Sequence, residues 1–366
     1  MDKKRLSQLR LLLKKNNFGA ILISSLANII YLTDFAYFSD MEREAFLLFT
    51  PKNQFIFTDG RYTHAVKTHI TDFELIEISG NQSLQEALQK CIKEEKIKTL
   101  GIEKNNLVVS EYEQMSELVN EIKNFSLSPL RIKKSTDELV KIQKACAIAD
   151  QIFSTIVTQI KTGMSEQDIA KEMSLIMLQK NVTPSFPTIV ASGENAAVPH
   201  HKTSDKKLQP NNIILLDFGV QFENYCSDMT RTLFFGKATP EQKTVYETVK
   251  NAQQRAIDFI EKKLIKKEII KASDVDTVAK KYILENNFPS IPHSLGHGIG
   301  LQVHEAPRLS PASKEVLTNG MVFSIEPGIY LPDDMGVRIE DLFTIQDDQL
   351  IQLTKSPKDF IEIPQN

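Results

Sequence analysis

Two aspartates in apolar, β-branched surroundings constrain the fold of this chain more than any other feature. Asp217 lies in Ile-Leu-Leu-Asp-Phe-Gly, and Asp228 lies in Tyr-Cys-Ser-Asp-Met-Thr-Arg-Thr. The two runs meet around residues 222–224, so we expect one β-hairpin. A turn centred between Phe222 and Glu223 would set the two aspartates directly opposite each other on one face. Two buried like charges in that position destabilise a sheet unless something compensates them.

A second acidic pair occurs closer to the C-terminus. Glu326 lies in Ser-Ile-Glu-Pro-Gly-Ile-Tyr, and Glu340 lies in Gly-Val-Arg-Ile-Glu-Asp. A turn centred on Asp333 would set Glu326 opposite Glu340. One acidic residue in a hairpin is usually solvated, but two facing pairs in apolar strands are hard to explain in structural terms alone. The pattern therefore predicts two hairpins that each present two carboxylates.

A histidine between these hairpins completes a possible ligand set. His297 lies in His-Ser-Leu-Gly-His-Gly-Ile-Gly. One imidazole added to four carboxylates suits manganese, cobalt, zinc or iron better than calcium. The five residues together could bind two divalent metal ions.

Two other interpretations of the glycine-rich segment are weaker. His293 precedes His297 by four residues and could be a second ligand on a helix, but the glycines at 296, 298 and 300 argue against a helix. The same glycines could form a phosphate-binding loop. They do not follow a Rossmann-type strand, however, and they lack the usual spacing and a downstream ribose-binding acid.

The order and spacing of these motifs resemble those of the pita-bread metallopeptidases of the M24 type. The matching motifs are Asp217-Phe218-Gly219, Ser227 to Thr232, Gly296 to Gly300 with His304-Glu305, Glu326 to Tyr330, and Gly336 to Asp341. The whole chain resembles the proline-specific branch, which comprises Xaa-Pro aminopeptidase and Xaa-Pro dipeptidase (prolidase). Residues 28–34 and 58–62 are similar to the auxiliary domain of that branch, although Asp34 stands where the family often has glycine.

The resemblance implies a metal-binding role for each candidate ligand. Asp217 would bind one ion, His297 and Glu326 the other, and Asp228 and Glu340 would bridge both. Mn²⁺ is the expected ion, with Co²⁺, Zn²⁺ or Fe²⁺ as alternatives. Such ions lower the pKa of bound water from about 16 toward 7, and Glu326 would relay its proton as a catalytic residue.

The resemblance also implies a set of residues that contact the substrate. His200 and His304 are expected to be catalytic and to contact the peptide, and His293 is expected in the same pocket. Arg338 alternates with Glu340 and would therefore face the metal side, where it could hold a ligand carboxylate. With Tyr330, it completes the expected substrate-binding set. His201 has no clear role.

The expected activity is hydrolysis of the Xaa-Pro bond at the N-terminus of short proline-containing peptides, as in Xaa-Pro aminopeptidase. Xaa-Pro dipeptidase shares every motif and remains the alternative, because it differs only in requiring a carboxylate after proline. A non-catalytic peptide-binding member and a metal-independent creatinase are disfavoured, since all five ligands are present. The resemblance also implies a homodimer.

The length of 366 residues favours two domains. Residues 1–130 alternate helical and strand patterns, as in a small α/β domain, with expected helices at 6–15, 83–95 and 110–123 and strands at 20–24, 45–50, 54–58, 73–78 and 99–102. Residues 131–366 would form the pita-bread catalytic domain, an α+β fold in which helix, helix and hairpin occur twice. Ser135 and Glu138 predict a capping box that opens a helix reaching about Lys161.

Composition agrees with a cytoplasmic enzyme. The net charge of −3 and a pI near 6.2 give no electrostatic reason to expect nucleic acid or membrane as a partner. No apolar stretch is long enough to span a bilayer, and the first residues lack the apolar core of a signal peptide. Three cysteines without a Cys-x-x-Cys pattern argue against a disulfide framework.

Overall fold

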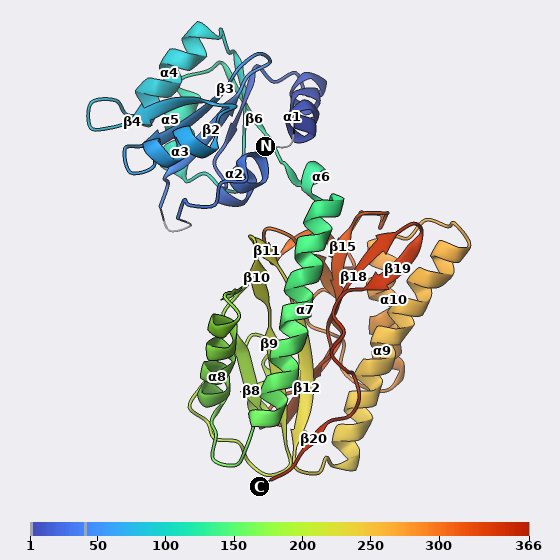
Figure 1. Ribbon diagram of the computed structural model, residues 1–366. Helices are drawn as coiled ribbons and strands as arrows, with labels where there is room; N and C mark the ends of the chain where they lie inside the picture. The colour runs from blue at the N-terminus through green and yellow to red at the C-terminus, as the bar shows by residue number, and fades with distance from the viewer. Residues whose placement is uncertain (1–2, 40–41, 366) are drawn as a thin grey trace. The chain divides into compact units, whose positions relative to one another are not determined.

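The chain divides into two compact units, Met1–Leu130 and Arg131–Asn366 (Figure 1). The structure, a computed structural model, describes residues 3–39 and 42–365. No helix in these ranges has the length and apolar character needed to cross a membrane.

The first unit is built on a mixed six-stranded sheet with the order β4-β3-β2-β1-β5-β6. Its strands are β1 (Ala20–Ile23), β2 (Ala45–Phe49), β3 (Gln54–Asp59), β4 (Glu74–Ile78), β5 (Thr99–Ile102) and β6 (Glu121–Asn124). Its helices are α1 (Lys3–Lys15), α2 (Leu26–Thr33), α3 (Thr63–His69), α4 (Leu84–Glu94) and α5 (Val109–Ser116), and α6 (Ser128–Arg131) leads into the second unit. The expected hairpin is present, because β2 and β3 pair in antiparallel register.

The helix expected over 110–123 is wrong in its second half. Helix α5 ends at Ser116, and Glu121–Asn124 form β6, which pairs with β5 in parallel register. The apolar spacing of this segment suits a helix, but β5 is paired with β1 on its other side only. The unpaired edge of β5 therefore takes up residues 121–124, because exposed strand edges pair readily.

In the described residues of the second unit, four long helices surround two larger sheets. The helices are α7 (Thr136–Gln159), α8 (Glu166–Gln179), α9 (Pro240–Ile265) and α10 (Ala272–Glu285), with a short 3₁₀ helix η1 at Gly193–Ala197. Helix α7 begins with the predicted capping box, in which the Ser135 hydroxyl accepts from the Glu138 N–H and the Glu138 carboxylate accepts from the Ser135 N–H.

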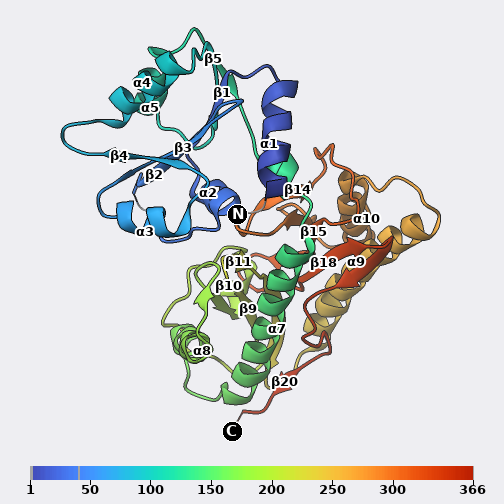
Figure 2. The same cartoon turned by 45° about the horizontal axis from the view of Figure 1, so that its top comes forward.

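The two main sheets have the orders β20-β12-β9-β8 and β14-β13-β15-β18-β19. Their strands are β8 (Ile189–Ser192), β9 (Asn212–Phe218), β12 (Met229–Phe235), β20 (Glu362–Ile363), β13 (Gly296–Gly298), β14 (Glu305–Leu309), β15 (Val322–Ile325), β18 (Asp341–Gln346) and β19 (Gln349–Gln352). Shorter pairings involve β7 (Thr183–Pro184), β10 (Val220–Phe222) and β11 (Tyr225–Cys226), and β16 (Gly328–Leu331) with β17 (Met335–Arg338). Figure 2 shows α7 and α8 beside β9 and β10, and α8 also contacts β8. On the other side, α9 contacts β19 and α10 contacts β14.

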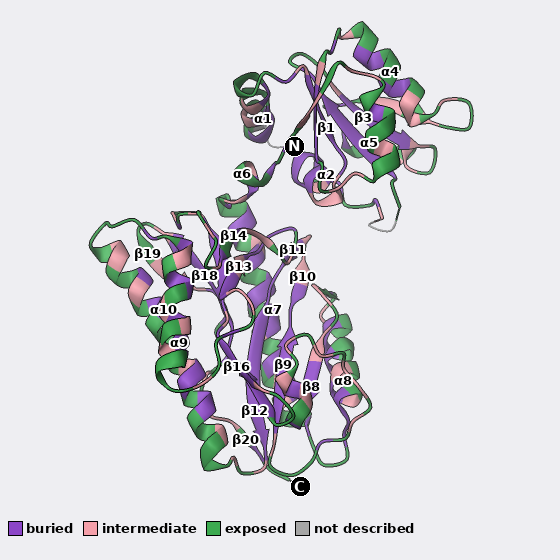
Figure 3. Ribbon diagram, turned by 180° about the vertical axis from the view of Figure 1, so that it is seen from behind, coloured by how far each residue is buried: buried purple, intermediate pink, exposed green. Residues whose placement is uncertain are grey.

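Strand β9 separates two apolar cores. Ile214, Leu216 and Phe218 pack into the core beneath α7 and α8, whereas Ile213 and Leu215 pack into the core beneath α9 and α10. Figure 3 shows β8, β9 and β12 largely buried between helices whose outer faces are exposed. Since side chains alternate along a strand, Asp217 lies on the face of Ile213 and Leu215. The strand thus carries a carboxylate where its core-facing row of apolar side chains ends.

The first hairpin differs from its expected register by two residues. Thr230, not Asp228, pairs with Asp217, because the turn residues are Glu223 and Asn224, with φ of 45° and 70°. Positive φ at both positions is typical of the two-residue turns that match strand twist. The two aspartates still share one face of the hairpin, but they lie diagonally rather than opposite each other.

The second hairpin has the expected register. Gly328 pairs with Arg338, and Ile325 pairs with Asp341. Glu326 and Glu340 lie between these pairs, at facing positions in the same register.

Candidate active site

A pocket of about 580 Å³ in the second unit brings the sequence-predicted residues together. It is lined by all of them except Tyr330, that is by His200, Asp217, Asp228, His293, His297, His304, Glu326, Arg338 and Glu340, together with Phe186, Ile189, Pro199, Ser294, Gly296, Val303, Glu305 and Arg308. Both hairpins and β13 contribute, so the site lies where the two sheets meet.

Three of the candidate ligands converge on one point. Asp228, His297 and Glu340 each present a ligand atom, and these atoms lie within 4.8 Å of one another. The Nε2 atom of His297 is 3.6 Å from Oδ2 of Asp228 and 3.3 Å from Oε1 of Glu326. These separations leave room for a cation between the side chains.

Protein groups compensate the carboxylates of this cluster only in part. Among the described residues, Oδ1 of Asp228 and Oε1 of Glu340 are buried without a hydrogen-bond partner. Burial and neighbouring carboxylates raise the pKa of Asp228 and of Glu340 well above the usual values. Burial also raises the pKa of Glu326 to about 7. Such a donor set fits divalent cations, which would satisfy the unpartnered oxygens.

The tautomer of His297 suits a metal ligand. Its Nδ1 lies 3.1 Å from the carbonyl oxygen of Gly298, which can only accept, so Nδ1 carries the proton. Burial lowers the pKa of His297, which keeps the ring neutral. The Nε2 lone pair is therefore directed at the carboxylates. Ser324 links this histidine to Glu326, since the Ser324 hydroxyl accepts from the backbone N–H of His297 and donates to the Glu326 carboxylate.

Asp217 is held by a buried arginine. Nη2 of Arg338 donates to Oδ2 of Asp217 at 2.6 Å, Nε donates to the hydroxyl of Thr230 at 3.1 Å, and Nη1 donates to the hydroxyl of Tyr330 at 2.8 Å. Thr230 in turn donates to Oε2 of Glu340 at 2.7 Å. With only 3 % of its surface exposed, Arg338 acts on two candidate ligands, directly and through Thr230, and its donors are taken by protein groups.

Tyr330 and His293 continue the hydrogen-bond chain from Arg338. The tyrosine hydroxyl lies 2.9 Å from Nε2 of His293, and Nδ1 of His293 lies 2.8 Å from the carbonyl oxygen of Ser294. Burial lowers the pKa of His293 to about 4 and raises that of Tyr330 to about 12, so both groups are neutral near pH 7. Protein groups thus occupy both ring nitrogens of His293.

His200 and His304 differ from His293, because in the described part of the chain neither ring forms a hydrogen bond. The His304 ring stands edge-on to the His297 ring, with 4.4 Å between centroids, and burial lowers its pKa to about 4. His200 is exposed at the pocket. Both rings are available to a bound peptide.

Arg308 was not among the residues expected from the sequence. It belongs to β14, pairs directly with His297 across the strands, and lines the pocket. Its Nε donates to the hydroxyl of Ser294 at 3.0 Å, and within the described ranges its two terminal NH₂ groups have no partner. No local motif marks this arginine, and only the pairing of β13 with β14 brings it to the site.

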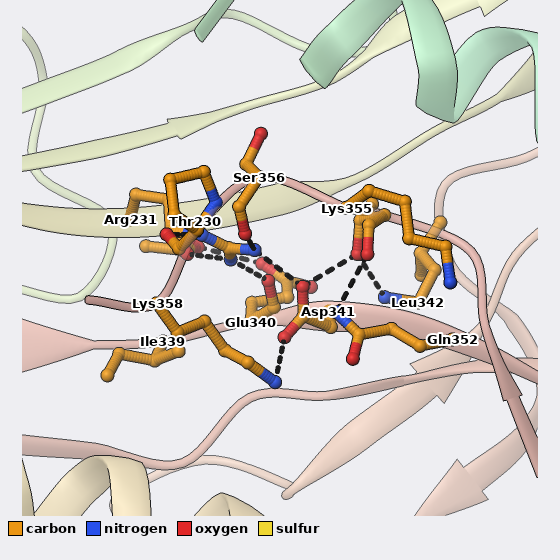
Figure 4. Close-up of polar contacts among 12 residues, drawn as sticks. Thr230, Arg231, Ile339, Glu340, Asp341, Leu342, Gln352, Lys355, Ser356 and Lys358 are labelled. Carbon is orange, nitrogen blue, oxygen red and sulfur yellow. Dashed lines mark hydrogen bonds and ion pairs between the residues drawn. The ribbon is translucent and has the colours of Figure 1, made fainter. Parts of the chain in front are cut away.

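A buried ion pair joins the two hairpins beneath the site (Figure 4). Nη2 of Arg231 donates to Oδ1 of Asp341 at 2.6 Å, while Nη1 donates to the carbonyl oxygens of Thr230 and Glu340. The Glu340 N–H also donates to the Thr230 carbonyl oxygen at 3.1 Å. Burial alone would raise the pKa of Asp341, but Arg231 and Lys358 outweigh it and hold that pKa below its usual value. The ionised pair therefore fixes Glu340 beside β12.

Comparison with known proteins agrees with this architecture. Residues 140–347 match metallopeptidase family M24, and residues 5–133 match the creatinase/prolidase N-terminal domain. An Xaa-Pro dipeptidase from Lactobacillus delbrueckii subsp. lactis is 34% identical over 374 residues, which cover 98% of this chain and 99% of that protein.

Solved structures give the same result over the whole chain. A recombinant prolidase from Thermococcus sibiricus superposes with a TM-score of 0.91 at 31% identity and covers 99% of both chains. An X-Pro aminopeptidase from Thermotoga maritima MSB8 superposes with a TM-score of 0.85, also at 31% identity, over 98% of this chain and 99% of that one. The chain therefore belongs to metallopeptidase family M24, whose members use divalent metal ions, and it combines the pita-bread catalytic domain with the creatinase/prolidase N-terminal domain.

Proposed function

We propose that the protein is an Xaa-Pro dipeptidase that depends on two divalent metal ions. The sequence alone favoured Xaa-Pro aminopeptidase, with the dipeptidase as the alternative. Two findings reverse that preference: the dipeptidase and prolidase names of full-length relatives, and the position of Arg308 in the pocket.

Asp217 would hold one ion, His297 and Glu326 the other, and Asp228 and Glu340 both. The two buried carboxylate oxygens without partners support this assignment, because a cation would compensate their charge. When bound, the ions would supply a water nucleophile of lowered pKa and polarise the peptide carbonyl. Carboxylate and imidazole donors together suit Mn²⁺, and Co²⁺, Zn²⁺ or Fe²⁺ are chemically possible.

The other residues of the pocket would bind the peptide and transfer protons. Glu326, whose Oε1 lies 3.3 Å from Nε2 of His297, would accept the proton of the attacking water as a general base. His304 is neutral and could donate an N–H to the developing oxyanion without adding charge. His200 would contact the peptide near the scissile bond, and the exposure of this residue at the pocket supports that role.

Arg308 is the residue that would select a dipeptide as substrate. An Xaa-Pro dipeptide has a free carboxylate on the residue after the scissile bond, and this anion needs a cation inside the pocket. Two arginines line the pocket, but Arg338 is buried and its donors serve Asp217, Thr230 and Tyr330. Arg308 lies opposite His297 and keeps its terminal NH₂ groups available within the described ranges. A longer peptide would present an amide there instead.

Hydrolysis of Ala-Pro, Ala-Pro-Ala and Ala-Ala by Mn²⁺-supplemented protein tests the proposal. We expect fast cleavage of Ala-Pro only. Arg308→Met should raise KM for Ala-Pro by about 10- to 100-fold, since a charge-assisted hydrogen bond contributes about 1.5–3 kcal/mol. Lys314→Met, in the nearby segment before β15, is the control for loss of one positive charge and should leave KM unchanged.

Xaa-Pro aminopeptidase remains the second candidate, because a solved X-Pro aminopeptidase has the same fold over the whole chain. Efficient cleavage of Ala-Pro-Ala, with a KM that Arg308→Met does not change, would establish the aminopeptidase instead. Cleavage of Ala-Ala at a similar rate would remove the specificity for proline.

A further inference from the structure

The position of His200 depends on the backbone that carries it. Its ring forms no hydrogen bond to the described residues and is exposed, so no side-chain contact orients it. His200 belongs to residues 192–204, which we call the His200 loop; this segment starts at the last residue of β8, contains η1 and ends before β9. A long loop holds a side chain in place only if its own backbone is fixed.

Glu166 lies at the centre of this loop. It is the first residue of α8, and its side chain is 0% exposed. Its carboxylate accepts six hydrogen bonds, all from the loop: from the N–H and hydroxyl of Ser192, the amide of Asn195, Nε2 of His201, and the N–H and hydroxyl of Ser204. The loop is therefore wrapped around one buried carboxylate.

These contacts explain how the protein retains a buried charge at this place. Burial raises the pKa of Glu166, but the hydrogen bonds from Ser204, Asn195, His201 and Ser192 outweigh burial and hold the pKa below its usual value. The carboxylate is thus ionised at neutral pH, and each of its donors is bound by a charge-assisted hydrogen bond. Removing one donor should weaken the loop at that donor's position.

Both chain neighbours of His200 are fixed. On one side, Nε2 of His201 lies 2.9 Å from the Glu166 carboxylate. On the other side, the carbonyl oxygen of Pro199 accepts from Nη1 of Arg338 at 3.3 Å, and the same guanidinium holds Asp217. The backbone of His200 is therefore clamped between a buried anion and the arginine that orients a candidate metal ligand.

We propose that Glu166 and His201 are positioning residues that act through His200, and that their hydrogen bond sets the place of the His200 ring relative to the bound peptide. The inference rests on the role proposed above for His200. A shift of about 1 Å in a substrate-contacting group can cost about 100-fold in rate, so loss of this anchor should reduce kcat without loss of the fold.

Variants of His201 and Ser204 separate positioning from general support of the loop. His201→Gln keeps an N–H donor at the place of Nε2, whereas His201→Asn is too short to reach Glu166. Ser204→Ala is the matched control, because it removes another donor to the same carboxylate four residues away from His200. With the Mn²⁺-loaded enzyme and Ala-Pro, we expect kcat to fall about 10-fold or more for His201→Asn and less than about 3-fold for the other two.

A double-mutant cycle with His200→Ala supplies the readout that a purely structural role would not change. If His201 acts through His200, His201→Asn should have no further effect on kcat in the His200→Ala background, while metal content stays that of His200→Ala. Glu166→Asp, which keeps the charge but shortens the side chain, should behave like His201→Asn. It provides the test if His201→Asn does not fold.

The outcomes distinguish failure of this inference from failure of the proposed function. A 10-fold loss that persists in the His200→Ala background, or an equal loss for Ser204→Ala, would overturn the positioning role while the peptidase assignment stands. Wild-type kcat in His200→Ala itself would instead overturn the proposed role of His200. Wild-type kcat in both His201→Asn and Glu166→Asp would overturn the inference alone.

Discussion

The metal-free protein should lose stability relative to the metal-loaded protein as the pH rises from 5 to 8. Burial is the largest cause of the raised pKa values of Asp228, Glu340 and Glu326, and for Glu326 the pKa rises from 4.5 to about 7. A raised pKa means that the folded protein binds a proton that the unfolded chain has released. The proton bound to Glu326 therefore contributes to the free energy of unfolding. This contribution is fully present below pH 4.5 and is lost as the pH rises through about 7.

The magnitude follows from Glu326 alone. A pKa that rises from 4.5 to about 7 corresponds to about 3 kcal/mol of lost stability above pH 7. For a domain of this size, 1 kcal/mol shifts the unfolding midpoint by about 2–4 °C, so a decrease of about 10 °C is expected. Asp228 and Glu340 act in the same direction, because their pKa values are raised as well.

The assay compares thermal unfolding of chelator-treated and Mn²⁺-loaded protein at pH 5, 6, 7 and 8, followed by circular dichroism. Titrating groups away from the site affect the loaded and the metal-free protein equally, so the difference between the two midpoints reports on the site. Glu326→Gln should reduce the pH dependence of the metal-free protein, whereas Glu285→Gln, on the exposed face of α10, should leave it unchanged. If the gap in midpoint between loaded and metal-free protein stays constant or narrows from pH 5 to 8, the reasoning is refuted.

Three further substitutions test the site. Asp228→Asn should abolish Mn²⁺-dependent hydrolysis of Ala-Pro without loss of the folded state, because a neutral amide cannot serve as an anionic ligand; near-normal turnover would contradict the assignment. Thr230→Val removes the hydroxyl that donates to Glu340 at 2.7 Å, so metal affinity, measured by competition with a chelator, should fall by about 10- to 100-fold. Gly219→Ala would place a Cβ atom 1.8 Å from the carbonyl oxygen of Ser227, so soluble folded protein should not form, as judged by yield and circular dichroism.

Local patterns predicted much of the second unit because their physical causes are local. The turn at Asp333, with φ of 60°, gave the correct register for the second hairpin, and the Ser135–Glu138 capping box lies where the sequence indicates. The predicted register of the first hairpin was wrong by two residues. The turn contains Glu223, a residue that seldom adopts positive φ, together with Asn224. The shift matters chemically, because it brings Thr230 opposite Asp217.

Long-range contacts could not be predicted in the same way. Arg308 reaches the pocket only because β13 and β14 pair beside each other, and Glu166 is 26 residues away in sequence from the first loop residue that it binds. Neither residue belongs to a motif that marks its role. Helical spacing in residues 117–123 likewise gave no sign that the free edge of β5 would take up a strand.

The ion pair of Arg231 and Asp341 joins segments that leave the ribosome at different times. Arg231 donates to the backbone of Glu340 and to the carbonyl oxygens of Ser356 and Pro357, so its hydrogen bonds are complete only after residue 357 has been made. A nascent chain that ends after the first hairpin carries two aspartates but none of the later candidate ligands. The proposed metal site is therefore complete only after both hairpins and residues 356 and 357 have been synthesised.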